Sequence, residues 1–255
     1  PVQHSQLIAL LSPNQNLQGK RILVTGASSG IGNAIAVACA NAGAIVISTG
    51  RNRDALDSLT TSLDGDGHSY IVADLTDTAD RDRLVQAIPP VDGVVHAAGI
   101  GQTLPAKFTT EQDVDKVFDI NFKAPVMLQT QLITNKKIAK GASIVFIASI
   151  TATKPMVGNS LYSASKAALV SYARVLALEL APRKIRVNCI SPAMVWTKLL
   201  STGGISLEQL KADEQTYPLK RYGQPEDIAP LSVYLLSEAS SWMTGSNIDI
   251  TGGIH

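Results

Sequence analysis

Short apolar runs rich in valine and isoleucine alternate with longer helical stretches along most of the chain. Seven of these runs predict strands: Ile22–Thr25, Ile45–Thr49, Tyr70–Ala73, Val94–His96, Ile144–Ala148, Val187–Ile190 and Ile248–Ile250. They are apolar on both faces, as a parallel sheet covered by helices requires. The alternation therefore predicts an α/β fold, a Rossmann-like doubly wound parallel sheet of about seven strands with helices on both faces.

Two segments depart from this alternation. Residues 1–18 are expected to form an N-terminal extension, in which the apolar cluster Leu7–Leu11 predicts a short docking helix before a turn. Residues 193–223 follow the sixth strand and contain the amphipathic stretch Ser206–Glu214. A long excursion at this point is more often a lid or binding loop than packing, so we expect a substrate lid there.

The charges are balanced and evenly spread. The 255 residues include 22 basic and 21 acidic side chains, with a formal net charge of +1 and no basic block. This argues against nucleic acid or an anionic membrane as a partner. No apolar run reaches the length of a membrane span, and the first residues lack the features of a signal peptide. Cys39 and Cys189 lie in apolar runs without metal-ligand spacing, so we expect reduced thiols, no metal site and a cytoplasmic location.

The first strand runs into a glycine-rich turn, Gly26-Ala27-Ser28-Ser29-Gly30-Ile31-Gly32, which a helix follows. Glycines let the backbone approach a ligand, and the N-terminus of the next helix attracts a pyrophosphate. A tight structural turn could use the same residues, but the strand–turn–helix context favours phosphate binding. Residues 19–255 are therefore expected to form one dinucleotide-binding catalytic domain.

The end of the second strand indicates which dinucleotide binds. An NAD site carries Asp or Glu there for the ribose hydroxyls, whereas an NADP site carries Arg near the 2′-phosphate. Here the strand ends in Arg51-Asn52, and the first acid is Asp54 in the next helix. A guanidinium can hold a phosphate through two hydrogen bonds, with Asn52 assisting. We therefore expect NADP(H) in preference to NAD(H), although an exposed arginine at a strand end is also common.

Two further strand ends are placed to line the cleft. Asp74-Leu75 ends the third strand and Ala97-Ala98-Gly99 the fourth, where adenine and ribose would lie. Asp74 could accept a hydrogen bond from the adenine amine, or it could cap the helix predicted over Thr78–Ala87.

Tyr162 and Lys166 lie four residues apart in a segment without Gly or Pro, so a helix puts both side chains on one face. A free tyrosine has a pKa of about 10, and a nearby cation favours its phenolate. We expect Lys166 to lower the pKa of Tyr162 and make it a proton donor or acceptor at neutral pH. By itself so short a pattern is more often a core tyrosine beside a solvated lysine.

Together these residues resemble the short-chain dehydrogenase/reductase family, from about Leu17 to Gly253. Thr25–Gly32 matches the family's T-G-x-x-x-G-x-G, and Tyr162–Lys166 matches its Y-x-x-x-K. Ser149, at the end of the fifth strand, falls where the family carries its catalytic serine. The segment that contacts the nicotinamide is matched by Pro192, Val195 and Thr197.

The resemblance implies hydride transfer between nicotinamide and a carbonyl carbon, with Tyr162 moving a proton at the oxygen. It implies that Lys166 hydrogen-bonds the nicotinamide ribose and that Ser149 hydrogen-bonds the carbonyl oxygen. Asn121, in a helix expected over Val114–Leu132, matches the family's active-site asparagine and would hold a water between Lys166 and solvent.

Several positions depart from the commoner family pattern. His96-Ala97-Ala98-Gly99 stands for N-N-A-G, so the asparagine that usually braces this strand end is missing. Pro192-Ala193 stands for Pro-Gly, and Thr251-Gly252-Gly253 for Asp-Gly-Gly. Ser29 occupies a position that is often basic in NADP-dependent members, which leaves Arg51 as the main indication of a 2′-phosphate.

The substrate is less well defined. Candidate contacts are Gln102, Thr151, Asn159, Met194 and Trp196, with Thr103, Thr153, Leu199 and Leu200 nearby. Similarity in length and layout to β-ketoacyl-ACP reductases suggests a 3-oxoacyl thioester on acyl carrier protein or CoA, with the carrier docked by Lys137, Lys140 and Arg183. A sugar, polyol or small ketone is an alternative, and so is a non-catalytic NADP sensor. The family commonly forms homotetramers, and helices near 111–135 and 158–181 could supply a homotetramer or homodimer interface.

Overall fold

A computed structural model describes residues 15–197, 200 and 206–254. Seven parallel strands form one sheet in the order β3-β2-β1-β4-β5-β6-β7. The strands are β1 (Arg21–Thr25), β2 (Ile45–Gly50), β3 (Ser69–Val72), β4 (Val91–His96), β5 (Ile138–Ile147), β6 (Arg186–Pro192) and β7 (Asn247–Ile250). The predicted doubly wound sheet is confirmed, with the strand order reversing between β1 and β4.

All seven predicted strands are present, and only their ends differ. Ala73 and Ala148 lie just beyond β3 and β5, and β5 begins at Ile138, earlier than expected. Ile138 pairs with Val91 across a shift of register in β4. The sequence pattern missed this early pairing because Lys140 and Gly141 interrupt the apolar run.

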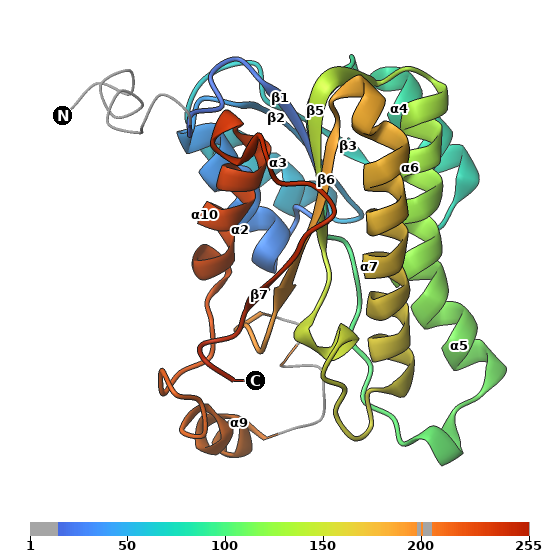
Figure 1. Cartoon of the computed structure of the whole chain (residues 1–255), viewed down its shortest axis with the longest axis vertical. Helices are drawn as coiled ribbons and strands as arrows, with labels where there is room; N and C mark the ends of the chain where they lie inside the picture. Colours follow the sequence, from blue (N-terminus) through green and yellow to red (C-terminus); the bar gives the residue numbers. More distant parts are fainter. Residues whose placement is uncertain (1–14, 198–199, 201–205, 255) are drawn as a thin grey trace.

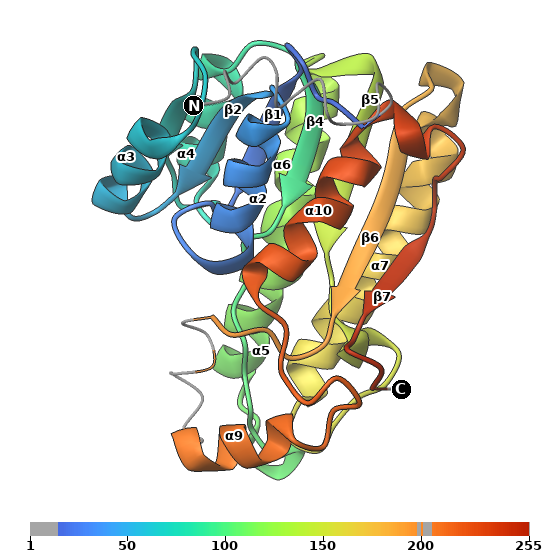
Figure 2. The same cartoon turned by 90° about the vertical axis from the view of Figure 1, so that its left-hand side faces the viewer.

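Helices cover both faces of the sheet (Figures 1 and 2). One face packs against α4 (Thr78–Ala87), α6 (Ala124–Thr134) and α7 (Ser160–Leu180), and the other against α2 (Gly30–Asn41), α3 (Arg53–Ser62) and α10 (Pro225–Leu236). Both interfaces are aliphatic and almost fully buried, which explains why the central strands are apolar on both sides. Among the described residues, no helix combines the length and apolarity that a bilayer span requires.

The helix expected over Val114–Leu132 is interrupted. The structure has α5 (Glu111–Phe118), a π-helical turn η2 (Asp119–Lys123) and then α6. Pro125 lacks the N–H that would donate to the Asn121 carbonyl in a regular α-helix, which favours the wider turn there. The interruption therefore coincides with one of the candidate site residues.

The carboxyl ends of the strands meet at the lower end of the molecule in Figure 1. The 3₁₀ turns η1 (Ala106–Phe108) and η3 (Ile150–Ala152), the start of α7 and helix α9 (Leu207–Glu214) lie at this end. The expected helix at Ser206–Glu214 is thus present, with Ser206 as its N-cap. The predicted docking helix at Leu7–Leu11 lies outside the described residues.

Candidate active site

The glycine turn after β1 is held in a conformation that only glycine suits. Gly26 has a φ of 66°, and a Cβ there would lie 2.8 Å from the Cα of Ala98. A Cβ on Gly32 would lie 2.5 Å from the Gly26 carbonyl oxygen. Ser29, at the N-cap of α2, makes no side-chain capping hydrogen bond. The first turn of α2 therefore offers its N–H groups to an anion, as a pyrophosphate site requires.

A cleft of about 410 Å³ opens at this turn. The sequence-predicted residues that line it are Gly26, Ser28, Ser29, Gly30, Ile31, Gly32, Arg51, Asp74, Leu75, Ala97, Ala98, Gly99 and Thr197. It lies at the carboxyl ends of the strands where their order reverses, the usual position of a dinucleotide in a doubly wound sheet. The residues present thus fit a nicotinamide dinucleotide.

Several lining residues were not expected. Thr25, Gly50, Ala73, Thr76, Ile100, Ile120, Ala124 and Pro125 also contribute to the cleft. Most of them adjoin predicted site residues in the sequence, and that adjacency was the signal available. Ile120, Ala124 and Pro125 are brought to the cleft by the π-helical turn around Asn121, which the sequence did not indicate.

One end of the cleft is formed by Arg51 and Asp74. Asp74 accepts from the backbone N–H (2.9 Å) and hydroxyl (2.7 Å) of Thr76. These hydrogen bonds lower the pKa of Asp74, and the charge of Arg51 lowers it further. Asp74 is not the cap of α4, because Asp77 takes that position. Arg51 is exposed and faces the cleft.

Asn52 has a different place from the one expected. Its Oδ1 accepts from the backbone N–H of Ala55 at 3.0 Å and caps α3. Asn52 does not line the cleft. A phosphate would accept a hydrogen bond from the Nδ2 of Asn52 and not from its Oδ1, so assistance to Arg51 stays a prediction.

The strand end at β4 is braced without the usual asparagine. The Thr25 hydroxyl accepts from the backbone N–H groups of Ala97 (3.1 Å) and Ala98 (3.2 Å). His96 points into the core, where its Nε2 lies 3.0 Å from Oε1 of Gln129. Its ring stacks on Phe146 with the centroids 4.6 Å apart. Thr25 and His96 together thus brace this strand end, a role that the commoner sequence pattern gives to an asparagine.

Ser149, Tyr162 and Lys166 converge beside this strand end. Ser149 follows β5 as the N-cap of η3, and Tyr162 and Lys166 lie one turn apart on α7. The Lys166 ammonium lies 5.8 Å from the Tyr162 ring centroid and donates to the Ile147 carbonyl at 2.8 Å. A Cβ on Gly99 would lie 3.4 Å from the Lys166 Nζ, so the loop after β4 closes against the pair.

Burial controls the pKa values of this pair. It raises the pKa of Tyr162, which a hydrogen bond with Ser149 partly offsets. It lowers the pKa of Lys166 to about 8. The expectation that Lys166 depresses the pKa of Tyr162 is wrong for this structure, because Lys166 is bonded to Ile147 and loss of solvent dominates. Tyr162 is therefore protonated at neutral pH and able to donate.

Both the oxygen and the nitrogen of the Asn121 side chain make hydrogen bonds to protein groups. Its Oδ1 accepts from the Ile100 N–H (2.8 Å), and its Nδ2 donates to the Ile100 carbonyl (2.9 Å) and to the Ser165 hydroxyl (3.2 Å). It thus fixes the loop after β4 to the π-helical turn. The Asn121 oxygen has a second lone pair, so the expectation that this amide holds a water stays a prediction.

In the described part of the segment after β6, Thr197 is the residue that lines the cleft. Thr197 lies against the glycine turn, because a Cβ on Gly30 would be 3.1 Å from its Cγ2. Pro192 ends β6, and Val195 is buried and forms an isolated bridge with Gly223. Neither lines the cleft, so of the three predicted residues only Thr197 does.

The candidate substrate residues are mostly engaged with protein groups. Gln102 donates to Asp113 (3.0 Å), Thr151 bonds Ser149, and Trp196 Nε1 donates to Glu214 (2.6 Å). Met194, Trp196 and Leu200 pack against the hydrophobic cluster of Leu210, Tyr217 and Tyr222. Asn159 stands at the N-cap of α7 without a capping bond. Leu199 lies outside the described residues.

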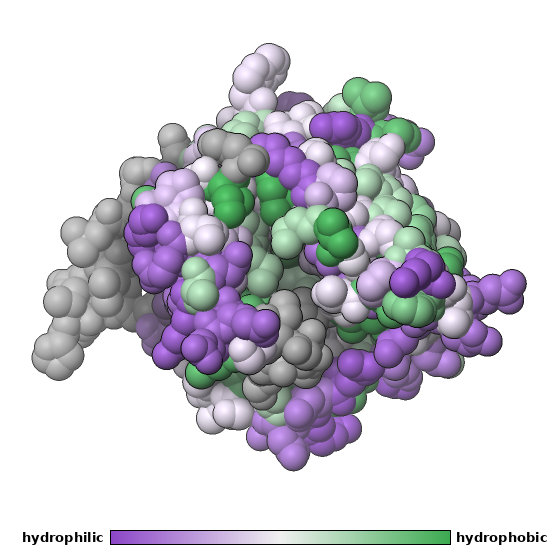
Figure 3. Space-filling model, turned by 90° about the horizontal axis from the view of Figure 1, so that it is seen from below, coloured by the Kyte–Doolittle hydropathy of each residue, from purple (hydrophilic) through white to green (hydrophobic). Residues whose placement is uncertain are grey.

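Figure 3 looks onto the end of the molecule where the carboxyl ends of the strands lie, and it shows apolar surface beside a hollow in this face.

The predicted carrier-docking residues are at the wrong end. Lys137 donates to the Ile88 carbonyl (2.6 Å), Arg183 donates to the Ile138 carbonyl (2.6 Å), and Lys140 lies near the start of β5. The start of β5 and the end of α7 are at the top of Figure 1, opposite Ser149 and Tyr162. The prediction was wrong because nearness in sequence to site elements does not say which end of a long helix or strand a residue occupies.

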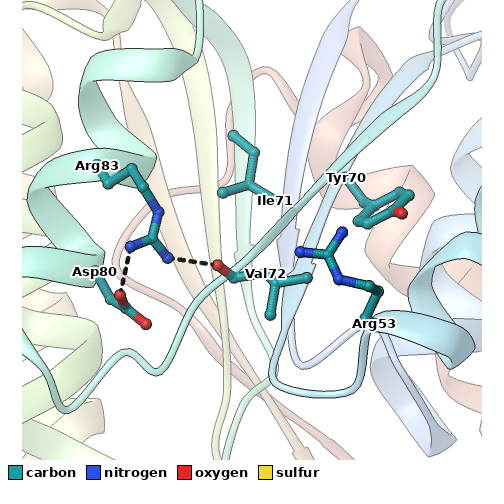
Figure 4. Close-up of a pocket in the computed structure, with 6 residues that line it drawn as sticks. All are labelled: Arg53, Tyr70, Ile71, Val72, Asp80 and Arg83. Atoms are coloured by element: carbon teal, nitrogen blue, oxygen red, sulfur yellow. Dashed lines mark hydrogen bonds and ion pairs between the residues drawn. The ribbon is translucent and has the colours of Figure 1, made fainter.

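A second hollow, of about 380 Å³, lies at the edge strand β3 (Figure 4). Arg83 donates to the Val72 carbonyl (2.8 Å) and to Asp80 (2.7 Å). Arg53 approaches Tyr70 and Val72 from α3. Arg83 therefore covers an open sheet edge, which would otherwise present an unpaired carbonyl.

A family model described as enoyl-(acyl carrier protein) reductase matches residues 26–255. Human dehydrogenase/reductase SDR family member 4 is 34% identical, with 93% of this chain and 88% of that protein covered. The chain belongs to the short-chain dehydrogenase/reductase family. It is an oxidoreductase, and the family uses nicotinamide cofactors.

Two further relatives differ in their named activities. The 3-oxoacyl-[acyl-carrier-protein] reductase of Rickettsia bellii is 36% identical, with 94% of this chain and 98% of that protein covered. The structure of L-sorbose reductase from Gluconobacter frateurii, complexed with NADPH and L-sorbose, matches with a TM-score of 0.86 and 28% identity, covering 94% of this chain and 98% of that one. Relatives with these two named activities are thus 36% and 28% identical to this chain.

Proposed function

We propose that this protein is an NADP(H)-dependent oxidoreductase that interconverts a carbonyl compound and a secondary alcohol. The observation that carries the proposal is the convergence of Ser149, Tyr162 and Lys166 beside the dinucleotide cleft. The bound nicotinamide would supply or accept the hydride. Tyr162, protonated at neutral pH, donates the proton to the carbonyl oxygen. Ser149 donates a hydrogen bond to the same oxygen, which strengthens as negative charge develops there.

Replacing Tyr162 by Phe tests the proton role. The variant keeps the ring and its packing but has no proton to give, so we expect kcat to fall by roughly 10²–10⁴-fold with NADPH affinity within about threefold of wild type. NADPH oxidation and fluorescence titration measure the two quantities. A Phe variant with wild-type turnover excludes this role, whereas a wild-type protein that binds NADPH but turns over no carbonyl supports the non-catalytic sensor.

The preference for NADP(H) is inferred from Arg51 and from the lack of an acid at the end of β2. We expect Arg51→Ala to weaken NADPH binding by roughly 10–100-fold, as loss of a charged hydrogen-bond pair requires, and to leave NADH binding nearly unchanged. Arg53→Ala is the matched control, because Arg53 is exposed nearby but lines the other hollow. Equal losses for both nucleotides would contradict the assignment.

A 3-oxoacyl thioester is the first candidate substrate class. Met156 and Val157 are exposed and give the loop between Ser149 and Tyr162 apolar surface. An acyl chain suits such a surface better than a polyol does. Acetoacetyl thioesters on CoA or acyl carrier protein should therefore be reduced with higher kcat/KM than keto-sugars. Faster turnover of a sugar, polyol or small ketone would retain the mechanism and discard the carrier as a partner.

A further inference from the structure

One residue, Thr151, donates both of the hydrogen bonds that the Ser149 hydroxyl oxygen accepts from described residues. The Ser149 Oγ accepts from the backbone N–H of Thr151 at 3.2 Å and from the Thr151 hydroxyl at 3.0 Å. Ser149 and Thr151 are both only 6% exposed. Among the contacts of the described residues, the Thr151 hydroxyl has no acceptor besides Ser149, so its proton points at the serine.

A serine hydroxyl has two acceptor lone pairs and one proton. With both lone pairs occupied by Thr151, the Ser149 proton must point away from η3, toward Tyr162 and the position of the substrate oxygen. Donation into a hydroxyl also polarises its own O–H, which makes it a stronger donor in a water-poor site. Thr151 therefore does not have to touch the substrate to affect the reaction.

We propose that Thr151 is a positioning residue that fixes Ser149 as a hydrogen-bond donor to the reacting oxygen. This inference rests on the proposed function of Ser149 and replaces the expectation that Thr151 is a wall of the substrate site. Among the described residues, Lys166 is the ionisable group that faces Tyr162, and Cys189 of β6 faces Lys166 in turn. No charged group other than Lys166 is thus needed to explain the behaviour of Tyr162.

The test compares Thr151→Val with Thr151→Ser. Valine keeps the shape and the backbone N–H but removes the hydroxyl, so kcat should fall roughly 5- to 20-fold with little change in KM. Serine restores the hydroxyl, and kcat should return to within about threefold of wild type. Thr61→Val is the control, because Thr61 lies on α3 outside the site and its hydroxyl donates to the Asp57 carbonyl. Equal losses in the Val and Ser variants would show that packing, not the hydroxyl, matters.

A double-mutant cycle separates positioning from general structure. On a Ser149→Ala background, Thr151→Val should cost less than about twofold further, because the group it orients is gone. Independent effects of the two substitutions would overturn the inference. Thermal unfolding of each variant checks that the fold is retained.

A titration judges the inference without turnover. The ultraviolet absorbance of wild type minus that of Tyr162→Phe, measured as a function of pH, follows the ionisation of Tyr162. The same subtraction between Thr151→Val and the double variant Thr151→Val/Tyr162→Phe gives the ionisation of Tyr162 without the Thr151 hydroxyl. The pKa of Tyr162 should rise by roughly half a unit in Thr151→Val, since a weaker donor at Ser149 stabilises the phenolate less. An unchanged pKa would contradict the inference. If wild type reduced no carbonyl, the proposed function would fail, and this titration would still decide the role of Thr151.

Discussion

At the scale of single residues, the site depends on the absence of a Cβ at two glycines and on the burial of Tyr162 and Lys166. Gly26 and Gly32 keep the turn open because any Cβ would meet backbone atoms. Burial raises the pKa of Tyr162, so its phenol holds the proton at neutral pH. Lys166 keeps its charge below a pH of about 8 and loses it above that value. A protonated Tyr162 is thus present at neutral pH, as a proton donor in carbonyl reduction must be.

His96 makes stability depend on pH. Burial lowers its pKa from 6.5 to about 4, and its Nδ1 has no described partner to stabilise a charge. The unfolded chain therefore binds more protons between these pH values, and stability falls as the pH drops through them. From pH 7 to pH 5 we expect a loss of about 2 kcal/mol in the free energy of unfolding. Urea unfolding at both pH values measures it.

The control for this prediction is His96→Asn, which has no titratable group at that position. Its stability should change less between pH 7 and pH 5 than that of wild type. The same decline in both proteins would assign the effect to other groups.

At the scale of elements, one carboxylate joins the two ends of the segment that we predict to be a substrate lid. Glu214 in α9 accepts from the Trp196 indole (2.6 Å) and from the backbone N–H of Tyr222 (3.0 Å). These contacts join the chain after β6 to the segment before α10. Trp196 is thus part of the internal packing of the lid, which is a different role from the direct substrate contact expected of it.

Removing this carboxylate should loosen the lid. We expect Glu214→Ala to raise amide hydrogen exchange over residues 194–197 and 206–223 and to lower kcat/KM by roughly 3- to 10-fold, because two hydrogen bonds to a charged acceptor are lost. Glu208→Ala, in the first turn of the same helix, is the control. If the two variants behave alike, Glu214 does not hold the lid.

At the scale of the whole molecule, part of the surface of α6 and α7 is not covered by the other residues that the structure describes. Met127, Val175 and Leu178 are exposed there, with Leu178 at 77%. Val175 and Leu178 are three residues apart, so they share one face of α7. Exposed apolar side chains grouped in this way mark an interaction surface. We propose that these helices join copies of the chain into a homodimer or homotetramer.

Light scattering tests the proposed assembly. Wild type should have a mass of at least two chains, and Leu178→Glu should shift it toward a single chain, because a charge would be buried in the interface. Leu219→Glu is the control, since Leu219 is similarly exposed but lies before α10 rather than on this face. A single-chain mass for wild type would contradict the proposal.

The amino-acid sequence by itself determined the sheet, the glycine turn and the placing of Tyr162 and Lys166 on one helix face, because these depend on periodicity and on short spacings. Ser149 and Asn121 were candidates only through the family resemblance. Tertiary structure decided the rest. Thr25 braces β4 and Asn121 ties η2 to Ile100 through partners far away in the chain. The pKa of Tyr162 depends on burial, which no local pattern reveals. The prediction that Lys137, Lys140 and Arg183 dock a carrier was wrong for the same physical reason. A residue's place along the chain does not specify which end of the molecule it occupies.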